Sequence, residues 1–310
     1  MQWLTGVPNF QFMKYRRVAL IGSSVANAIA ILSLIVFGLN WGIDFTGGVL
    51  LEVTYSSEAD LSSIRQDLEA AGINEARVQT FGSTSDVLIR LPPLGDTSDT
   101  TALEERLMGI LRAKHPDVQK QRLEAVGGQV GSELAENGAL AMLFALIMIF
   151  IYVMVRFRWK LALGAIVATV HDVIVTVGVF SLLGWQFDLT VLGSVLAVLG
   201  YSLNDTIVVY DRIRDNFRLM RRFTPHAVVD ASVNQTLART LVTGVTSLLV
   251  LIALMLLGGD TLWGFAVALI IGIVVGTYSS IYVASAMALA LNVTAADLVA
   301  EKRKEVDEMP

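Results

Sequence analysis

An amide and an acid, Asn204 and Asp205, interrupt a stretch of sequence that is otherwise apolar enough to cross a lipid bilayer. If a helix covers 189–210, a rise of about 1.5 Å per residue places Asp205 roughly 8 Å from the helix midpoint. The hydrocarbon core reaches about 15 Å to each side of its midplane, so the carboxylate is still inside it. An ionisable residue at that depth is costly and indicates a functional site with a partner side chain. The alternative is that the helix lies one turn further out and Asp205 is simply hydrated.

A basic side chain, Arg239, is predicted at a matching depth in the next apolar run. It lies about 12 Å from the centre of that helix, and its long stem can bridge the remaining distance to Asp205. Both helices carry small side chains at helical spacing, which would let a neighbouring backbone approach closely. These are Gly193, Ala197, Gly200 and Asn204 on the first helix, and Thr236, Thr240, Thr243 and Ser247 on the second; Gly272, Gly276 and Ser280 repeat the spacing in the last run. An Asp205 that alternately pairs with Arg239 and separates from it would release and bind a proton in turn.

A second ionisable pair, His171 and Asp172, falls near the middle of another apolar run if that helix starts at Leu161. One interpretation is a proton-accessible pair near the midplane. The other is two polar side chains that hydrogen-bond to neighbouring helices and only stabilise the packing. The sequence leaves both interpretations open.

The composition requires a membrane to hold these residues. Hydrophobic residues make up 54% of the chain and charged residues only 16%, and the mean hydropathy is +0.62, which together exclude an ordinary soluble protein of this size. Six apolar runs of spanning length predict a polytopic α-helical membrane protein: 18–39, 138–155, 161–183, 189–210, 237–257 and 262–289. The first run is too long for a signal-peptide core, so it is interpreted as a retained anchor.

Lys and Arg residues predict the orientation of the six helices. Fifteen of the 23 lie in short segments on one side of the predicted bundle, and the short turns on the other side, 184–188 and 258–261, carry none. Both termini are therefore expected in the cytoplasm. The predicted division is a cytoplasmic arm 1–17, a first helix 18–39, an outer domain 40–137, helices two to six within 138–289 with a basic interfacial elbow 211–236, and a cytoplasmic tail 290–310.

The outer loop has the pattern of an independent α+β domain. Period-two apolar alternation from Val49, two hairpin strands around 82–85 and a last strand up to Val126 alternate with two helical patterns. The order βαββαβ predicts a ferredoxin-like domain with one sheet and two covering helices. This domain contains most of the acidic excess behind the net charge of −5, so the charge does not indicate nucleic acid.

The chain carries no pattern typical of an enzyme. It has no cysteine, and His115 of the outer loop has no second His nearby, so neither a thiolate nor a metal site is expected. No serine–histidine–aspartate arrangement and no phosphate-binding loop stands out. We expect no enzymatic activity and no cofactor.

Five motifs together resemble the SecD/SecF family of the resistance-nodulation-division superfamily, and within it the smaller of the two paired subunits. They are GIDFTGG at 42–48, VGGQVGSEL at 126–134, HDV at 171–173, GYSLNDTIVVYDRIRDN at 200–216 and SVNQTLARTLVTG at 232–244. The resemblance covers nearly the whole chain, with the motifs in the family order. One departure is Gly128, where the family usually has proline.

The resemblance implies an accessory subunit of the Sec protein-export channel in the bacterial inner membrane, which uses the proton motive force to help complete translocation. It implies a SecD partner, because the chain has only half the helices of that architecture, and further partners in the SecYEG channel, YajC, YidC, the translocating unfolded protein and membrane lipid. By motif position Asp205 and Arg239 match residues implicated in proton transport, and Asn204, His171 and Asp172 are grouped with them. The family signature comprises Gly42, Asp44, Phe45, Gly47 and Gly48 and has no chemical role derivable from the sequence; Asp44 alone is most simply a cap or turn former.

Two other functions compete with this one. A small-molecule or lipid exporter of the same superfamily would be expected to carry two large outer loops, whereas this chain has one of modest size. A purely structural membrane subunit, which holds partners together without conducting protons, is compatible with all five motifs.

Overall fold

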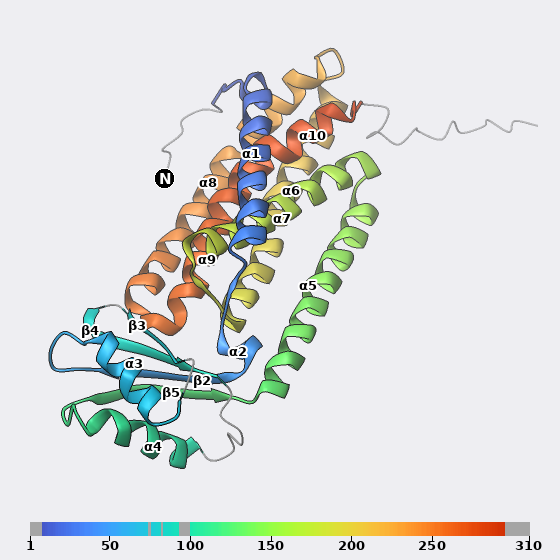
Figure 1. The fold of residues 1–310 in the computed structure, drawn as a ribbon. Helices are drawn as coiled ribbons and strands as arrows, with labels where there is room; N and C mark the ends of the chain where they lie inside the picture. The colour runs from blue at the N-terminus through green and yellow to red at the C-terminus, as the bar shows by residue number, and fades with distance from the viewer. Residues whose placement is uncertain (1–7, 74–75, 82, 93–99, 295–310) are drawn as a thin grey trace, which may run out of the picture. The chain divides into compact units, whose positions relative to one another are not determined.

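The computed structural model describes residues 8–73, 76–81, 83–92 and 100–294. The chain divides into two compact units, one made of residues 1–40 and 142–310 and the other of residues 41–141. We call them the membrane unit and the α+β unit. Each is described by itself (Figure 1).

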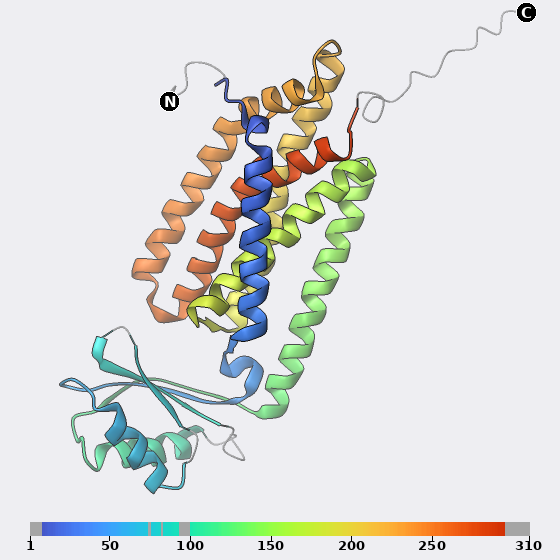
Figure 2. The same ribbon diagram turned by 45° about the horizontal axis from the view of Figure 1, so that its top comes forward.

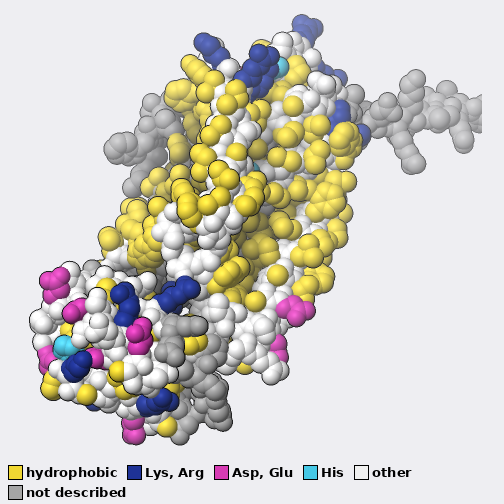
Figure 3. All heavy atoms as spheres, viewed as in Figure 1, with side chains coloured by type: hydrophobic (Ala, Val, Ile, Leu, Met, Phe, Trp, Pro, Cys, Tyr) yellow, Lys and Arg dark blue, Asp and Glu magenta, His cyan; other side chains and the backbone are white. Residues whose placement is uncertain are grey.

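Within the described ranges, six helices are long and apolar enough to cross a membrane, as the sequence predicts. They are α1 (Arg16–Val36), α5 (Gly128–Arg156), α6 (Trp159–Leu183), α7 (Leu189–Leu219), α8 (Pro225–Leu257) and a last span formed by α9 (Gly259–Ser279), η2 (Ser280–Ala284) and α10 (Ser285–Ala290). The short elements η1 (Phe12–Lys14), β1 (Asn40–Trp41) and β6 (Gln186–Phe187) lie beside them in the sequence. Figure 2 shows these helices from a second direction, and Figure 3 shows the apolar side chains that cover their visible face.

Helix ends in the membrane unit follow local chemistry. Gly184 ends α6 in the left-handed region, with φ of 66°, where a residue without Cβ is favoured. Asp188 caps α7, because its Oδ1 accepts a hydrogen bond from Val191 N at 2.8 Å. Thr224 caps α8 and Pro225 occupies the first helical position, where no amide hydrogen is needed.

The predicted interfacial elbow over 211–236 is not a separate element. Helix α7 continues without a break to Leu219, and α8 begins at Pro225, so the elbow consists of two helix ends and a five-residue turn. The physical reason is that no glycine or proline interrupts 201–219. Buried side chains such as Ile213 and Phe217 also hold this extension against the core of the membrane unit.

The last span contains a π-helix, η2, which the sequence pattern did not predict. Ser285 Oγ donates to the carbonyl oxygen of Ser280 at 3.1 Å, and thus satisfies a backbone group within the widened turn. Such turns are rare and often mark functional sites. Here η2 faces α6 and α7, the helices that carry His171, Asp172 and Asp205.

The small-residue faces of α9 and α7 differ in what they contact. The predicted packing face of α9 is confirmed, since a Cβ on Gly276 would lie 3.0 Å from Ser202 Cβ, and Val198 contacts the Gly272 position. The stripe on α7, from Gly193 to Asn204, is exposed, and no neighbouring atom lies near Gly193 or Gly200 in the described part of the chain. The contact of α7 with α9 is made on another face, by Val198 and Ser202.

The α+β unit has the predicted element order. It comprises α2 (Ile43–Thr46), β2 (Gly48–Thr54), α3 (Leu61–Ala70), β3 (Arg77–Phe81), β4 (Ser83–Leu91), α4 (Thr100–Arg112) and β5 (Gln119–Val126). The four strands form one antiparallel sheet in the order β3-β4-β2-β5, with Leu51 of β2 opposite Ile89 of β4 and Leu123 of β5. The side chains of Val49, Leu51 and Val53 join Ile64 and Leu68 of α3 and Leu107 and Leu111 of α4 in one core.

Candidate functional site

A carboxylate lies fully buried where three helices of the membrane unit meet. Asp172 of α6 has no exposed surface, and its Oδ2 accepts hydrogen bonds from Ser279 Oγ of α9 at 2.8 Å and from Ser202 Oγ of α7. Its Oδ1 lies 2.8 Å from His171 Nδ1. Both carboxylate oxygens are therefore satisfied, and Asp172 ties α6, α7 and α9 together.

His171 has one nitrogen engaged and one without a partner. A carboxylate oxygen can only accept, so the bond to Asp172 places a hydrogen on Nδ1 of His171. Nε2 is buried and has no hydrogen-bond partner among the residues that the structure describes. The His171 ring lies 6.4 Å from that of Tyr278, whose hydroxyl donates to the carbonyl oxygen of Ala19 in α1 at 2.8 Å.

Hydroxyl groups continue this polar cluster towards η2. Thr206 of α7 lies 2.8 Å from Ser280 Oγ, and Tyr210 OH donates to the carbonyl oxygen of Ala284 at 2.9 Å. All four residues are buried. Two side chains of α7 therefore form hydrogen bonds with η2, one with a side chain and one with a backbone carbonyl.

Asp205, three residues after Ser202 on α7, has a carboxylate oxygen that is not satisfied. It is 3% exposed, and its Oδ2 is buried with no hydrogen-bond partner within the described ranges. Tyr201, one turn earlier, has an equally unpartnered buried hydroxyl. A Cβ placed on Gly244 of α8 would lie 3.9 Å from Tyr201 OH and from Thr277 Oγ1 of α9, so this pocket of polar groups borders α8. A buried carboxylate oxygen without a donor is costly and able to take up a proton.

Arg239 and Asn204, the predicted neighbours of Asp205, both lie at the surface of the membrane unit. The charge of Arg239 attracts that of Asp205, but among the described residues no ion pair joins the two side chains. Asp205 and Arg239, which the sequence predicted at matching depths, are therefore not paired with each other in this structure. His171 and Asp172 contact each other, and Ser202 of α7 connects their helix to the one that carries Asp205.

Sequence reasoning did not identify the hydroxyl residues of this cluster. Ser202, Thr206, Ser279 and Tyr201 contribute as much to it as the ionisable residues do. One signal was available, because Ser202 precedes Asp205 by three residues and therefore lies on a nearby face of the helix. No sequence signal pointed to Ser279, because serine is common in helix packing.

Substitution of Asp172 measures how far the cluster holds the helices together. Asp172→Asn replaces one of the two acceptor oxygens by a donor, so either both serine hydroxyls or His171 Nδ1 lose their acceptor, and the chain should lose about 1–2 kcal/mol of stability. Ser279→Ala removes a single hydrogen bond and should cost about 0.6 kcal/mol. Thermal unfolding of the detergent-solubilised chain measures both, and a transition unchanged by Asp172→Asn would contradict the tying role.

The GIDFTGG segment forms a close-packed turn in the α+β unit. Gly42 precedes the one-turn helix α2, whose Ile43 and Phe45 are buried, and Asp44 lies in its first turn. Gly47 follows with φ of 68° and ψ of 175°, a conformation essentially restricted to glycine. Gly48 also has a positive φ, of 119°. The two glycines of the motif therefore set the backbone path of this turn.

A second glycine segment packs against this turn. A Cβ on Gly47 would lie 2.6 Å from Gly128 Cα, and a Cβ on Gly131 would lie 2.6 Å from Gly47 N. The backbones of the motifs at 42–48 and 126–134 are thus in contact with each other. Gly128 is the first residue of α5, a position that also accommodates proline.

Comparison with known proteins agrees with this architecture. The family described as "Protein export membrane protein SecD/SecF, C-terminal" matches residues 107–294, and the "SecD/SecF GG Motif" matches residues 32–59. "Protein translocase subunit SecF" of Vibrio alginolyticus is 49% identical over 303 residues, 96% of each chain. The protein of the same name from Pseudomonas aeruginosa is 46% identical over 308 residues, covering 98% of this chain and 99% of that one.

A solved structure shares the fold. The crystal structure of SecDF, a translocon-associated membrane protein from Thermus thermophilus, aligns with a TM-score of 0.83 at 38% identity. The alignment covers 94% of this chain and 39% of that one. A second SecDF structure, in a super-membrane-facing form, aligns over the same shares with a TM-score of 0.70.

Six apolar helices in the described part of the chain, with a buried ionisable cluster between α6, α7 and α9 and one α+β unit after the first helix, define a multi-pass membrane protein with a polar site between its helices. The chain belongs to the SecD/SecF family of protein-export membrane proteins, on the SecF side of that family. Its relatives carry the name of a translocase subunit and not of an enzyme, which confirms the expectation that it is not an enzyme. The membrane that it crosses is the inner membrane.

Proposed function

We propose that this chain is an accessory subunit of the Sec protein translocase and that it uses the proton motive force to assist translocation. The observation that carries the proposal is the buried Oδ2 of Asp205, which has no hydrogen-bond donor among the described residues and is attracted by the charge of Arg239. A carboxylate with no fixed donor gains most from proton uptake or from an approaching guanidinium. Export stimulated by a proton gradient in cells that carry Asp205→Asn tests the proposal.

The proposed cycle moves Asp205 between two states. In the separated state its carboxylate takes a proton, and in the paired state the approach of Arg239 favours the ionised form and releases it. The exposed Arg239 side chain has a long stem with which to make this approach. Each proton that crosses about 100 mV supplies about 2.3 kcal/mol, which can bias a conformational change.

His171 and Asp172 form the second part of the proposed relay. His171 Nε2 is the buried atom that can exchange a proton, and the satisfied Asp172 carboxylate orients the ring. Ser202 hydrogen-bonds to Asp172 and lies one turn before Asp205 on α7. A change in the charge of His171 would therefore be transmitted to the helix that carries Asp205.

One face of the membrane unit exposes polar and small residues that a partner subunit would cover. Asn204 and Arg239 are exposed on two membrane-spanning helices, where exposed polar groups facing lipid are costly. The exposed stripe of Gly193, Ala197 and Gly200 beside them would let another helix approach closely. We propose that a SecD subunit covers this face, and that the assembly works with the SecYEG channel, YajC, YidC, surrounding lipid and the translocating unfolded protein. In the SecDF structure the matched part occupies 39% of a longer chain.

The α+β unit is proposed to be a ferredoxin-like domain in the periplasm, with both termini of the chain in the cytoplasm. Its strand order and its two helices on one face fit such a fold. The asymmetric distribution of Lys and Arg supports the orientation.

Cysteine labelling tests this orientation in a chain that has no cysteine of its own. Ser57 of the α+β unit and Arg222 of the turn between α7 and α8 are both exposed. An impermeant thiol reagent added to cells with a permeabilised outer membrane should label Ser57→Cys, while Arg222→Cys should react only after the inner membrane is opened. Labelling of Arg222→Cys alone in closed cells would reverse the proposed orientation.

A further inference from the structure

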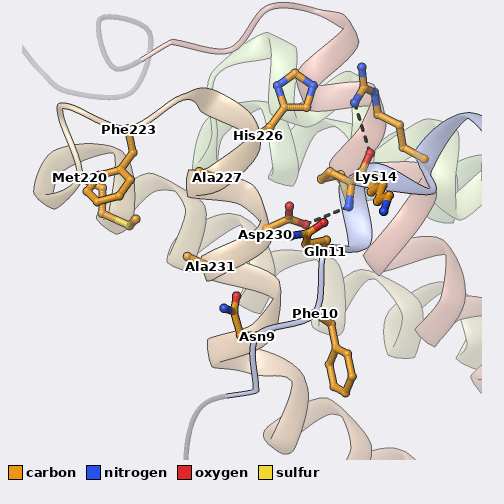
Figure 4. Close-up of a pocket in the computed structure, with 12 residues that line it drawn as sticks. Asn9, Phe10, Gln11, Lys14, Met220, Phe223, His226, Ala227, Asp230 and Ala231 are labelled. Atoms are coloured by element: carbon orange, nitrogen blue, oxygen red, sulfur yellow. Dashed lines mark hydrogen bonds between the residues drawn. The ribbon is translucent and has the colours of Figure 1, made fainter.

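A cavity of about 510 Å³ opens between the N-terminal arm, residues 8–15, and the start of α8. Figure 4 shows His226 and Lys14 towards one end, Met220 and Phe223 towards the other, and Asp230 and Gln11 between them. Its lining is Asn9, Phe10, Gln11, Met13, Lys14, Arg16, Met220, Phe223, His226, Ala227, Asp230 and Ala231. All of these belong to the membrane unit.

The arm that forms one wall is held in place by specific hydrogen bonds. Asn234 of α8 accepts from Phe10 N at 2.9 Å and donates to Phe10 O at 2.8 Å, as a paired strand would. Asp230 Oδ1 accepts from Met13 N at 2.8 Å, and the Met13 side chain is only 1% exposed. The cavity is thus preformed by the fold, and its shape does not depend on a ligand.

The charges that line the cavity leave a positive excess. Asp230 is the only acid of the lining, and its carboxylate is already engaged by the arm and attracted by the charge of His226. Lys14 and Arg16 form no ion pair with any carboxylate of the described residues. Arg16 Nη1 donates to Met13 O at 3.2 Å, which holds its guanidinium beside the cavity. Two cationic side chains at the edge of the cavity favour an anion with several acceptor oxygens.

The surroundings of the cavity are those of a membrane surface. Arg16 is the first residue of the spanning helix α1, and Pro225 of the spanning helix α8. Phe10 and Phe223 beside the cavity are 58% and 61% exposed, and the exposed Val18 and Ile21 follow on α1. A ligand held here has its charged end at the cavity and an apolar surface beside it, which fits a lipid and not a soluble anion.

We propose that this cavity binds the phosphate headgroup of an anionic phospholipid, with Lys14 and Arg16 as its charged partners. The acyl chains lie along the exposed apolar side chains of α1. This site lies apart from Asp205 and does not depend on the proposed proton-driven function.

The test uses the full chain, purified in mild detergent and offered phosphatidylglycerol and phosphatidylethanolamine in equal amounts. Native mass spectrometry should detect one phosphatidylglycerol retained in preference to the zwitterionic lipid. In the double variant Lys14→Gln/Arg16→Gln the affinity should fall about 30-fold, as a loss of about 1 kcal/mol for each of two surface charges predicts. The matched double variant Arg221→Gln/Arg222→Gln removes equal charge from the adjacent turn without touching the lining and should change the affinity less than about threefold.

A third variant separates binding from a structural effect of the arm. Asp230→Asn retains the acceptor for Met13 N but removes the only negative charge of the lining, so the affinity for phosphatidylglycerol should rise. An equal loss in both double variants, or equal retention of the two lipids, would overturn the proposal. It would also be overturned if soluble glycerol phosphate displaced the lipid completely at equal concentration, because the site would then recognise a free anion.

Discussion

Asp205→Asn is expected to abolish the stimulation of export by a proton gradient while the subunit still inserts and assembles. The asparagine keeps the volume of the side chain and an acceptor oxygen, but it cannot bind and release a proton. Because Oδ2 of Asp205 has no donor among the described residues, loss of the charge should be tolerated without loss of stability. Export of a secreted reporter, followed in a strain without its native subunit and with and without an uncoupler, measures the effect.

Asp211→Asn provides a matched control on the same helix. Asp211 lies six residues further along α7 and forms an ion pair with Arg156 at 2.6 Å, at a partly exposed position. Its substitution removes a carboxylate of the same kind but should leave proton-dependent export nearly intact, because exposed ion pairs contribute about 0–1 kcal/mol. Near-normal export by a stably assembled Asp205→Asn protein would eliminate the relay and favour a structural subunit that conducts no protons.

Arg239→Met forms the second arm of the same experiment. Removal of the guanidinium leaves a buried carboxylate that nothing draws towards ionisation, so the acid should stay protonated and export should be as low as in Asp205→Asn. Arg239→Lys retains the charge and should recover part of the activity, whereas a purely steric role of the side chain would be served equally well by methionine. The double variant should be no worse than either single one, because the two residues act in one step.

Hydropathy predicted the number of membrane helices but not their full lengths. Helix α6 ends at Leu183 as expected, whereas α5 begins ten residues before the predicted run and α8 begins twelve residues before it. The apolar pattern reports only the part of a helix that lies in lipid. A helix continues through polar turns until a cap or a breaker ends it, and the cap at Thr224 is a more local signal than hydropathy.

The candidate site could be predicted in its ionisable residues and not in their partners. Asp205 and Asp172 stand out because charged groups are rare in apolar runs. That Ser202 would bind Asp172, and that the Gly193–Asn204 stripe would be exposed, depends on which helix lies beside which, and helical periodicity does not contain that information. The residues that form a packing face can be predicted from the sequence of one helix, but the element that packs against that face cannot.

Gly47→Ala is expected to destabilise the α+β unit by about 3 kcal/mol or more. Two costs add at this position. The backbone has φ of 68° and ψ of 175°, which residues with a Cβ adopt only under strain, and the Cβ would lie 2.6 Å from Gly128 Cα. Because the contacting atom, Gly128 Cα, belongs to the backbone, it cannot rotate away as a side-chain atom would.

Two alanine variants of the same unit separate these costs. Gly72 has φ of 81° but open space around it, so Gly72→Ala reports the strain alone, at about 1 kcal/mol. Gly131 lies within α5 without a positive φ, and its Cβ would lie 2.6 Å from Gly47 N, so Gly131→Ala reports the close approach alone, at about 1–3 kcal/mol. Hydrogen exchange of residues 41–141 in the full chain measures all three. If Gly47→Ala cost no more than Gly72→Ala, the two glycine motifs would not form a backbone contact, and the structural explanation of the signature would be wrong.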